Sequence, residues 1–191
     1  MKRLLIAMAA MVAMSGVAQA QDIKFYAGTG LGAFGLELKA PGVSQKNTVF
    51  GGYAKFGVDF NEFVGGELRI GTTANGSTTY PGGVITLSGD SIFSYFLKLQ
   101  YPVAQDFRLY GLAGGTTAKM SLTINAPLLG LPVLKDSATK TGFSYGAGGE
   151  YFVSDQISFG AEWVQYWTNV NVGTSMDAKI WSATGTLSYH F

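Results

Sequence analysis

The closing stretch Lys179–Phe191, K-I-W-S-A-T-G-T-L-S-Y-H-F, decides the fold. Counted back from Phe191, every second residue is apolar, aromatic or small, and the residues between are polar apart from Ile180. Alternation with period two indicates a β-strand with one apolar and one polar face. It lasts about a dozen residues, whereas ordinary strands have roughly five or six. A strand that crosses a bilayer needs about 9–11 residues and carries aromatic side chains at the interfaces. The stretch therefore favours a membrane-spanning strand.

The first twenty residues predict an export signal. A basic start precedes the apolar run Leu4–Val12, and Ala18–Ala20 has the small-residue pattern of a cleavage site. The apolar run is too short for a spanning helix. We therefore predict a signal peptide over residues 1–20 and a single domain over residues 21–191. An uncleaved anchor is the alternative, and the cleavage pattern disfavours it.

The composition suits a sheet that turns apolar side chains toward lipid. Charged residues make up 13% of the 191 residues and glycine occurs 27 times, whereas about a quarter of a soluble domain is charged. Basic and acidic residues nearly balance, at 13 and 12, so no basic excess predicts a nucleic-acid partner. Cysteine is absent, so stability must come from burial or from closure of the sheet.

Segments with period-two patterning recur along the whole mature chain. They cover residues 23–33, 48–60, 63–73, 91–101, 107–120, 141–153, 156–170 and 179–191. In the fifth segment we favour Leu109 outward and Tyr110 inward, and the opposite phase is left open. Proline cannot donate to a strand ladder, so we expect Pro102 to end the fourth segment.

The connections between these segments are alternately short and long. Short turns are expected at residues 61–62, 103–106 and 154–155, and longer exterior loops at 34–47, 74–90, 121–140 and 171–176. Lipid offers the backbone no hydrogen-bond partner, so the strands must close on themselves. An even strand number puts both chain ends and the short turns on the periplasmic side. The predicted fold is all-β: an eight-stranded antiparallel up-and-down transmembrane β-barrel.

Four pieces of the chain resemble the small eight-stranded outer-membrane barrels of bacteria, represented by the OmpA transmembrane domain and OmpX. They are F-Y-A-G-T-G-L-G at 25–32, F-G-V-D-F with E-L-R-I at 56–60 and 67–70, G-A-G-G-E-Y-F with I-S-F-G-A-E-W at 146–152 and 157–163, and T-L-S-Y-H-F at 186–191. The resemblance covers residues 22–191. The soluble peptidoglycan-binding domain of full OmpA proteins is missing, so we do not expect anchoring to the cell wall by that route.

The resemblance also implies a location and partners. It implies a Gram-negative outer membrane, contact with outer-membrane lipid and lipopolysaccharide, and a monomer. In this family the last strand is read by the barrel-insertion machinery, which implies that Tyr189 and Phe191 form the insertion signal.

The predicted inward faces carry nine charged residues. They are Lys24, Lys55, Asp59, Glu67, Arg69, Lys98, Arg108, Glu150 and Glu162. Buried charges persist only when they are paired and hydrogen-bonded, and an eight-stranded barrel is just wide enough to be filled by side chains. A salt-bridge network that plugs the lumen is therefore favoured. The alternative is a gated or leaky ion path, in which Glu67 or Glu150 exchanges partners with Lys98.

Large aromatic side chains are expected in two girdles, one at each bilayer interface. We assign Trp163, Trp167 and Trp181 to the exterior girdle and Phe60, Tyr101 and Tyr151 to the periplasmic girdle. A ligand-binding aromatic box is the less favoured alternative.

The sequence predicts no catalytic residue, metal site or cofactor. Residues 30–35 match G-x-G-x-x-G, but Pro41 and Gly42 follow without helical periodicity, so the helix that would hold a dinucleotide is missing. Small inward residues in a narrow barrel explain these glycines. His190 is the only histidine, and it lies near the periplasmic terminus. A pair of nucleophile and base near the outer leaflet would therefore lack the histidine that usually accepts the proton. We therefore predict that the protein is not an enzyme.

One expected exterior loop is apolar. Residues 126–134, A-P-L-L-G-L-P-V-L, include Leu128–Leu134, which predicts a ligand, partner or membrane contact. The equal alternative is that the loop covers the barrel mouth or continues the hairpin above the membrane.

The sequence favours a barrel with a structural or surface-interaction role. A narrow channel for ions or small hydrophobic molecules, similar to the OmpW type, is the alternative. A soluble lipocalin-like binder would need its apolar face inward.

Overall fold

The computed structural model describes residues 23–40, 43–80, 83–125, 133–173 and 176–191. The predicted signal peptide and most of the apolar stretch Leu128–Leu134 lie outside these residues. Among the described residues, no helix is long and apolar enough to cross a membrane.

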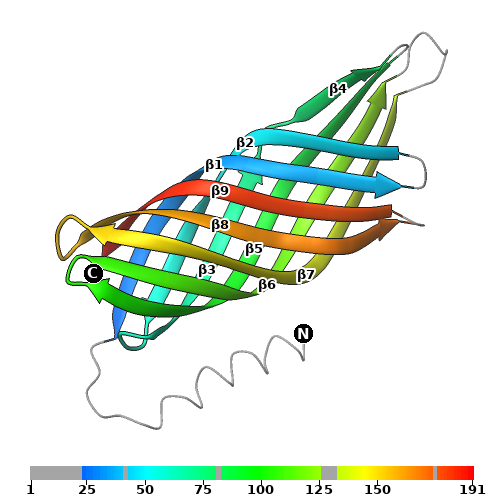
Figure 1. Ribbon diagram of the computed structural model, residues 1–191. Coiled ribbons are helices and arrows are strands. Elements are labelled where there is room, and N and C mark those ends of the chain that lie inside the picture. Colours follow the sequence, from blue (N-terminus) through cyan, green and yellow to red (C-terminus); the bar gives the residue numbers. More distant parts are fainter. Residues whose placement is uncertain (1–22, 41–42, 81–82, 126–132, 174–175) are drawn as a thin grey trace.

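Within the described residues, nine antiparallel β-strands form one closed sheet (Figure 1). They are β1 Lys24–Ala40, β2 Val43–Asp59, β3 Val64–Thr73, β4 Gly76–Tyr80, β5 Gly83–Ala104, β6 Phe107–Asn125, β7 Leu134–Phe152, β8 Ile157–Gly173 and β9 Met176–His190. The sheet closes at two seams: β1 pairs with β9, and β3 pairs with β5.

Strands β3 and β4 together occupy one position in the ring. Both pair with β5, and the strand is interrupted between them at Ala74 and Asn75. The Thr73 hydroxyl holds the break, because it donates to the Ala74 carbonyl (3.1 Å) and accepts from the Gly89 N–H (3.0 Å). The nine strands therefore fill the eight positions of the predicted eight-stranded barrel.

The two ends of the barrel differ. At the turn end, residues 60–63, 105–106 and 153–156 connect the strands. Asn61 fixes the first turn, since its side-chain oxygen accepts from the N–H groups of Phe63 and Val64 at 2.8 Å. The chain ends there too, where the Phe191 N–H donates to the Phe25 carbonyl at 2.9 Å. The opposite end, where the long hairpins project, is the hairpin end (Figure 1).

The predicted exterior loops were largely wrong, because the strands continue into them. Pairing reaches Ala40↔Val43, Tyr80↔Gly83, Ile124↔Leu134 and Gly173↔Met176. These stretches contain alternating Val, Ile, Leu and Thr, which favour strands, so the hairpins rise well above the apolar band. The fourth predicted strand also passes Pro102 and ends at Ala104. Pro102 is tolerated because a register shift there already interrupts the ladder.

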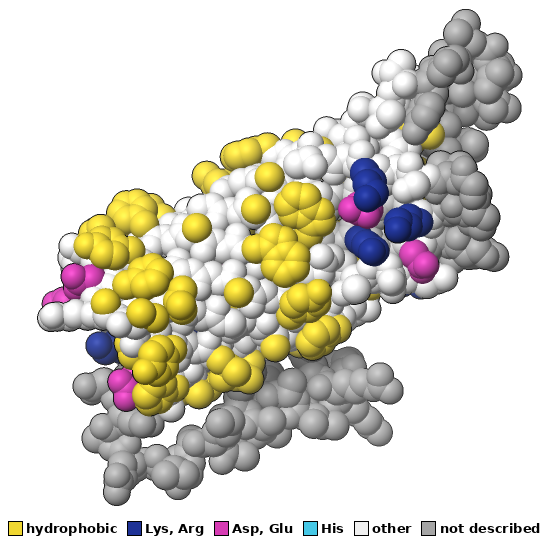
Figure 2. Space-filling model, in the orientation of Figure 1, with side chains coloured by type: hydrophobic (Ala, Val, Ile, Leu, Met, Phe, Trp, Pro, Cys, Tyr) yellow, Lys and Arg dark blue, Asp and Glu magenta, His cyan; other side chains and the backbone are white. Residues whose placement is uncertain are grey.

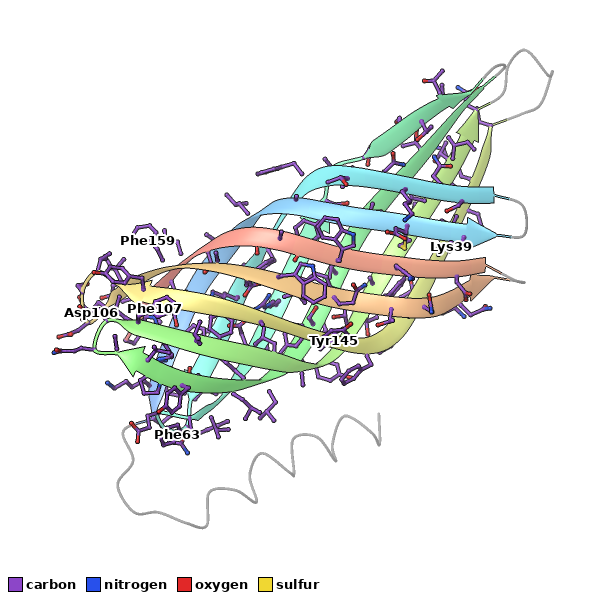
Figure 3. The ribbon with its side chains drawn as sticks, in the orientation of Figure 1. Lys39, Phe63, Asp106, Phe107, Tyr145 and Phe159 are labelled. Atoms are coloured by element: carbon purple, nitrogen blue, oxygen red, sulfur yellow. The ribbon has the colours of Figure 1, made fainter. Side chains whose placement is uncertain are left out.

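The predicted apolar outward face is confirmed. The inward face is small or polar toward the turn end only, because Phe34, Leu36 and Ile180 are buried inside the barrel toward the hairpin end. In the fifth segment, Leu109 is 48% exposed whereas Tyr110 is 6% exposed, which settles the phase that the sequence left open. Figure 2 shows the apolar side chains spread over the outer wall away from the hairpin end. Figure 3 shows Tyr145 and Phe159 on this wall, and Phe63, Asp106 and Phe107 at the turn end.

Trp167 faces inward, and its assignment to the exterior girdle was wrong. The β8–β9 register shifts between Gln165 and Trp167, and again between Trp167 and Val170. An extra residue in one strand of a pair reverses which face the next side chains occupy. Tyr166 and Trp167 are consequently both buried, at 1% and 0% exposed. The Trp167 indole N–H donates to the Thr116 carbonyl at 3.1 Å.

Candidate functional site: the barrel lumen

The lumen contains two blocks of side chains with different chemistry. Nearer the turn end lies the ion-pair network. It consists of Asp59, Glu67, Arg69, Lys98, Arg108, Glu150 and Glu162. Nearer the hairpin end lies the apolar plug. Its largest members are Phe34, Leu36, Tyr166, Trp167 and Ile180, and Phe96, which lies opposite Glu67 in the sheet, lies between the two blocks.

Arg69 is the centre of the ion-pair network. Its guanidinium donates to both carboxylate oxygens of Glu162, at 2.5 and 2.9 Å, and its Nε donates to Glu67. Arg69, Glu67 and Glu162 are 2%, 4% and 5% exposed. A bidentate arginine–carboxylate pair fixes both groups in orientation as well as in distance. The three side chains come from β3 and β8, so this cluster ties distant strands together across the lumen.

Lys98 and Arg108 extend the network toward the turn end. The Lys98 ammonium lies 3.6 Å from Glu150 and 4.0 Å from Asp59. Arg108 donates to the second oxygen of Asp59 at 2.9 Å. Lys98 also lies over the Tyr110 ring, 5.0 Å from its centre, a cation–π arrangement. Every carboxylate of the network therefore faces at least one cation.

Two of the predicted lumen lysines lie apart from these pairs. Lys55 is buried, at 5% exposed, with its ammonium 5.8 Å from the centre of the Tyr26 ring. Among the described residues it forms no salt bridge. Lys24 is exposed, and its inclusion in the lumen network was wrong. Lys24 is the first residue of β1 and lies at the water-facing rim of the turn end, where its charge stays solvated.

Three buried tyrosines complete the network, and the sequence reading missed their role. Tyr53 and Tyr110 donate to Glu162 at 2.5 and 2.9 Å, and Tyr26 donates to Glu67 at 2.7 Å. Each of the three rings lies across a glycine of the neighbouring strand, and that of Tyr110 lies 2.6 Å from the position of a Cβ atom at Gly148. A Cβ atom at Gly57 would lie 2.0 Å from the Tyr26 ring, and one at Gly30 would lie 2.2 Å from the Tyr53 ring. The signal in the sequence that could have identified them is an inward-facing tyrosine opposite an inward-facing glycine on the neighbouring strand.

The apolar plug is held by stacked aromatic rings. Tyr166 stacks on Phe34 with ring centres 6.1 Å apart and lies 6.4 Å from Phe96. Ile180 and Trp167 are both 0% exposed. Arg69 joins the two blocks, because its guanidinium lies 5.0 Å from the centre of the Phe96 ring. The two blocks therefore contact each other at Arg69.

His190 lies in the network near the turn end. Its Nε2 is 2.9 Å from the Ser158 hydroxyl and 3.5 Å from Glu150. The Ser158 hydroxyl also donates directly to Glu150 at 2.6 Å. In a nucleophilic triad the serine and the carboxylate bind opposite nitrogens of the imidazole. Here one nitrogen faces both groups, so this cluster has the geometry of a structural hydrogen-bond network.

The predicted girdle and insertion residues lie on the outer wall, apart from Trp167. Trp163, Tyr101 and Tyr151 are 42%, 64% and 51% exposed, whereas Phe60 and Trp181 are half-buried. Trp181 is half-buried because its indole lies over Gly35 of β1. The predicted insertion residues Tyr189 and Phe191 are 43% and 70% exposed, with ring centres 5.2 Å apart.

Comparisons with solved structures agree with this architecture. Neisserial surface protein A is 13% identical, with a TM-score of 0.63 over 87% of this chain and 97% of that chain. The attachment invasion locus protein Ail of Yersinia pestis is 17% identical, with a TM-score of 0.54 over 88% and 98%. The N-terminal β-barrel domain of Pseudomonas aeruginosa OprF is 17% identical, with a TM-score of 0.54 over 91% and 100%. Similarity at these identities shows the fold alone.

The family is shown by the sequence. No curated protein matches the chain. The model of the outer membrane protein beta-barrel domain, however, matches residues 4–191, nearly the whole chain. The chain therefore belongs to the outer membrane protein beta-barrel domain family and is an outer-membrane barrel protein.

Proposed function

We propose that this protein is a structural or surface-interaction barrel whose lumen is closed to solutes. The single observation that carries the proposal is the bidentate Arg69–Glu162 pair, which spans the lumen with both side chains at most 5% exposed. A hydrated ion path would leave these groups in contact with water. The apolar plug behind Arg69 adds a second barrier of a different kind.

The two barriers act in series. An ion that entered from the turn end would have to separate Arg69 from its carboxylates and then cross Phe34, Tyr166 and Trp167, which offer few polar groups in place of its water shell. Opening either block alone would leave the other closed. This arrangement supports a barrel that works through its outer wall and its hairpins.

A second function, uptake of small hydrophobic molecules, is favoured by one observation. A cavity of about 40 Å³ opens at the hairpin end, and Leu38, Leu87, Met120 and Leu122 are among its lining residues. Ligand pockets for small molecules usually measure about 300–1,000 Å³. A ring-sized solute would therefore need the hairpins to part before it could reach Trp167.

We also propose that the protein has no enzyme activity and needs no cofactor. The support is the Ser158–His190–Glu150 geometry, in which a single imidazole nitrogen faces both partners. Among the described residues, no group of three or more His, Cys, Asp or Glu side chains is placed to hold a metal ion.

The proposed topology places the turn end in the periplasm and the hairpin end outside the cell. The support is that the short turns, the start of β1 and the end of β9 all lie at the turn end. Bacterial barrels keep their short turns and both chain ends on the periplasmic side. We further propose cleavage after Ala20, a monomer, and reading of Tyr189 and Phe191 by the insertion machinery. Exposed rings on the last strand support the insertion role.

Solute flux through the refolded barrel, residues 21–191, tests both functions. Vesicles with the barrel in their membrane are loaded with a potassium-sensitive dye. After external potassium is added, the dye fluorescence should change no faster than in dye-loaded vesicles without the barrel. Faster flux would overturn the closed lumen. Quenching of tryptophan fluorescence by 1-naphthol reports hydrophobic uptake. The second function requires quenching that Trp167→Phe removes and Trp163→Phe retains, and the first function predicts no such difference.

A further inference from the structure

Lysines gather on the outer wall just above the apolar band. Figure 2 shows basic and acidic side chains together toward the hairpin end, over β1, β2 and β9. We name Lys39, Lys46 and Lys179, with Glu37 and Asp177, the wall patch. Lys39 and Lys46 are exposed and Lys179 is half-buried. Figure 3 shows Lys39 close to the hairpin end of β1.

The register of the sheet builds the wall patch. Glu37 lies opposite Lys46 on one side and opposite Lys179 on the other, and Lys39 lies opposite Asp177. All five side chains share the outward phase of their strands, the phase of Trp181. Lys46 is held by an ion pair to Glu37 at 3.4 Å, yet its side chain is 63% exposed. The wall patch therefore presents three ammonium groups against two carboxylates and keeps an excess of positive charge.

The wall patch lies at the depth of lipid headgroups. The outward rings of β9 run from Trp181 to Phe191, about ten residues or roughly 33 Å along a strand. At the usual strand tilt of about 40° this corresponds to a band about 25 Å high, the apolar thickness expected of an outer-membrane barrel. Lys179 then lies about 5 Å above Trp181, and Lys39 about 10 Å above it.

The wall directly below the wall patch is lined by small residues. In the register of β1, β9 and β8, Ala33 pairs with Ala183, and Ala161 pairs with Gly185. The large outward side chains beside them are Trp163 opposite Ala183, Phe50 opposite Ala33, and Leu31 opposite Gly185. A strip of small outward residues beneath a basic cluster leaves space for acyl chains that descend from a headgroup held by the lysines.

We infer that the wall patch is a binding site for a phosphorylated glycolipid of the outer leaflet, with the lysines on its phosphates and the acyl chains over Ala183. Clusters of lysine at a membrane interface attract anionic lipid headgroups. The inference rests on the orientation proposed above but not on the closed lumen.

Binding of purified lipid A tests the site. Bisphosphorylated lipid A is titrated into the refolded barrel in detergent with EDTA present, and the bound fraction is measured by native mass spectrometry. The variant with Lys39→Gln, Lys46→Gln and Lys179→Gln should bind at least tenfold more weakly. A matched control with Lys119→Gln, Lys135→Gln and Lys140→Gln removes the same charge from β6 and β7 and should stay within threefold of the unmodified barrel.

Further variants and ligands test the lysine charge, the contact with the acyl chains and the need for the lipid phosphates separately. Replacement of the three wall-patch lysines by arginine should retain binding, and Ala183→Phe should weaken it at least threefold. Lipid A without phosphates should bind at least tenfold more weakly, and inorganic phosphate alone should not compete. Equal binding by the glutamine variant and the control, or competition by inorganic phosphate, would overturn the site.

The orientation is tested separately. The chain has no cysteine, so Lys39→Cys supplies a unique thiol. A membrane-impermeant maleimide should label it on intact cells. Labelling only after the cells are broken would overturn the orientation, and with it the placement in the outer leaflet, whatever the potassium flux shows.

Discussion

The two regions of the lumen carry inward side chains of different chemistry. Toward the turn end, the inward positions hold charges that satisfy one another at fixed distances, as Arg69 does with Glu162. Toward the hairpin end, the inward positions hold rings and aliphatic chains such as Phe34 and Ile180. A charge network depends on every partner, whereas apolar packing depends mainly on volume. We therefore expect the network to fail when one group is removed and the plug to tolerate changes that conserve volume.

The largest effect should come from Arg69→Ala. This substitution leaves Glu67 and Glu162 buried without their cation, which should lower the free energy of unfolding by about 5 kcal/mol. Urea unfolding in lipid vesicles measures the change. The variant Arg69→Met with Glu67→Gln and Glu162→Gln removes all three charges together and should recover most of the loss. A loss below 1 kcal/mol for Arg69→Ala would contradict the tightly coupled network.

Trp167→Ala should cost somewhat less, about 3–4 kcal/mol, because it leaves a cavity in the apolar plug. Trp167→Phe should cost about 1 kcal/mol, since most of the ring volume remains. The matched control is Trp163→Ala on the outer wall, where lipid chains replace the lost contacts and the expected cost is about 1 kcal/mol or less. Equal losses for Trp163→Ala and Trp167→Ala in the same urea titration would contradict the inward placement of Trp167.

Gly57→Val should have an intermediate effect of about 1–3 kcal/mol, because its side chain would strike the Tyr26 ring and displace the phenol from Glu67. Gly57→Val combined with Tyr26→Ala should be less destabilising than the sum of the two single changes, since the clash is gone. Additive losses would mean that Tyr26 does not lie across Gly57.

The smallest effect should come from Lys24→Ala. Lys24 lies exposed at the rim, so its removal should change the free energy of unfolding by less than about 0.5 kcal/mol. Lys98→Ala serves as the buried comparison, because it leaves Glu150 and Asp59 facing an empty position. Similar losses for the two lysines would place Lys24 back in the network.

The sequence predicted the barrel and the inward charges because a membrane imposes both. Lipid on one side and a narrow lumen on the other force an alternation that is visible at Phe93–Tyr101 without any structure. The same logic placed Arg69, Lys98 and Glu162 on inward faces. It could not say which groups pair, because partners such as Arg69 and Glu162 are 93 residues apart in the chain and meet across the lumen.

The wrong predictions concern positions where the two-residue alternation is interrupted, or where both faces of a strand have similar polarity. The register shifts around Trp167 reverse its face, and nothing in the local sequence marks them. The stretch 74–83 is rich in Thr, Ser and Gly on both faces, so it resembled a loop although Gly76–Tyr80 pairs as a strand. Lys24 has the inward phase of β1 but is the first residue of that strand, so its side chain is exposed at the rim.

Single-channel conductance of four refolded barrels tests the two-barrier lumen most directly. The barrels are the unmodified protein, the Arg69→Ala/Glu162→Ala variant of the network, the Phe34→Ala/Trp167→Ala variant of the plug, and the variant with all four changes, each shown to be folded by its heat-dependent gel mobility. With two barriers in series, the first three should be silent in a planar bilayer and the fourth should show steady discrete steps. Steady steps from the unmodified barrel would contradict the closed lumen, and silence of the folded fourfold variant would show that these two blocks are not what closes it.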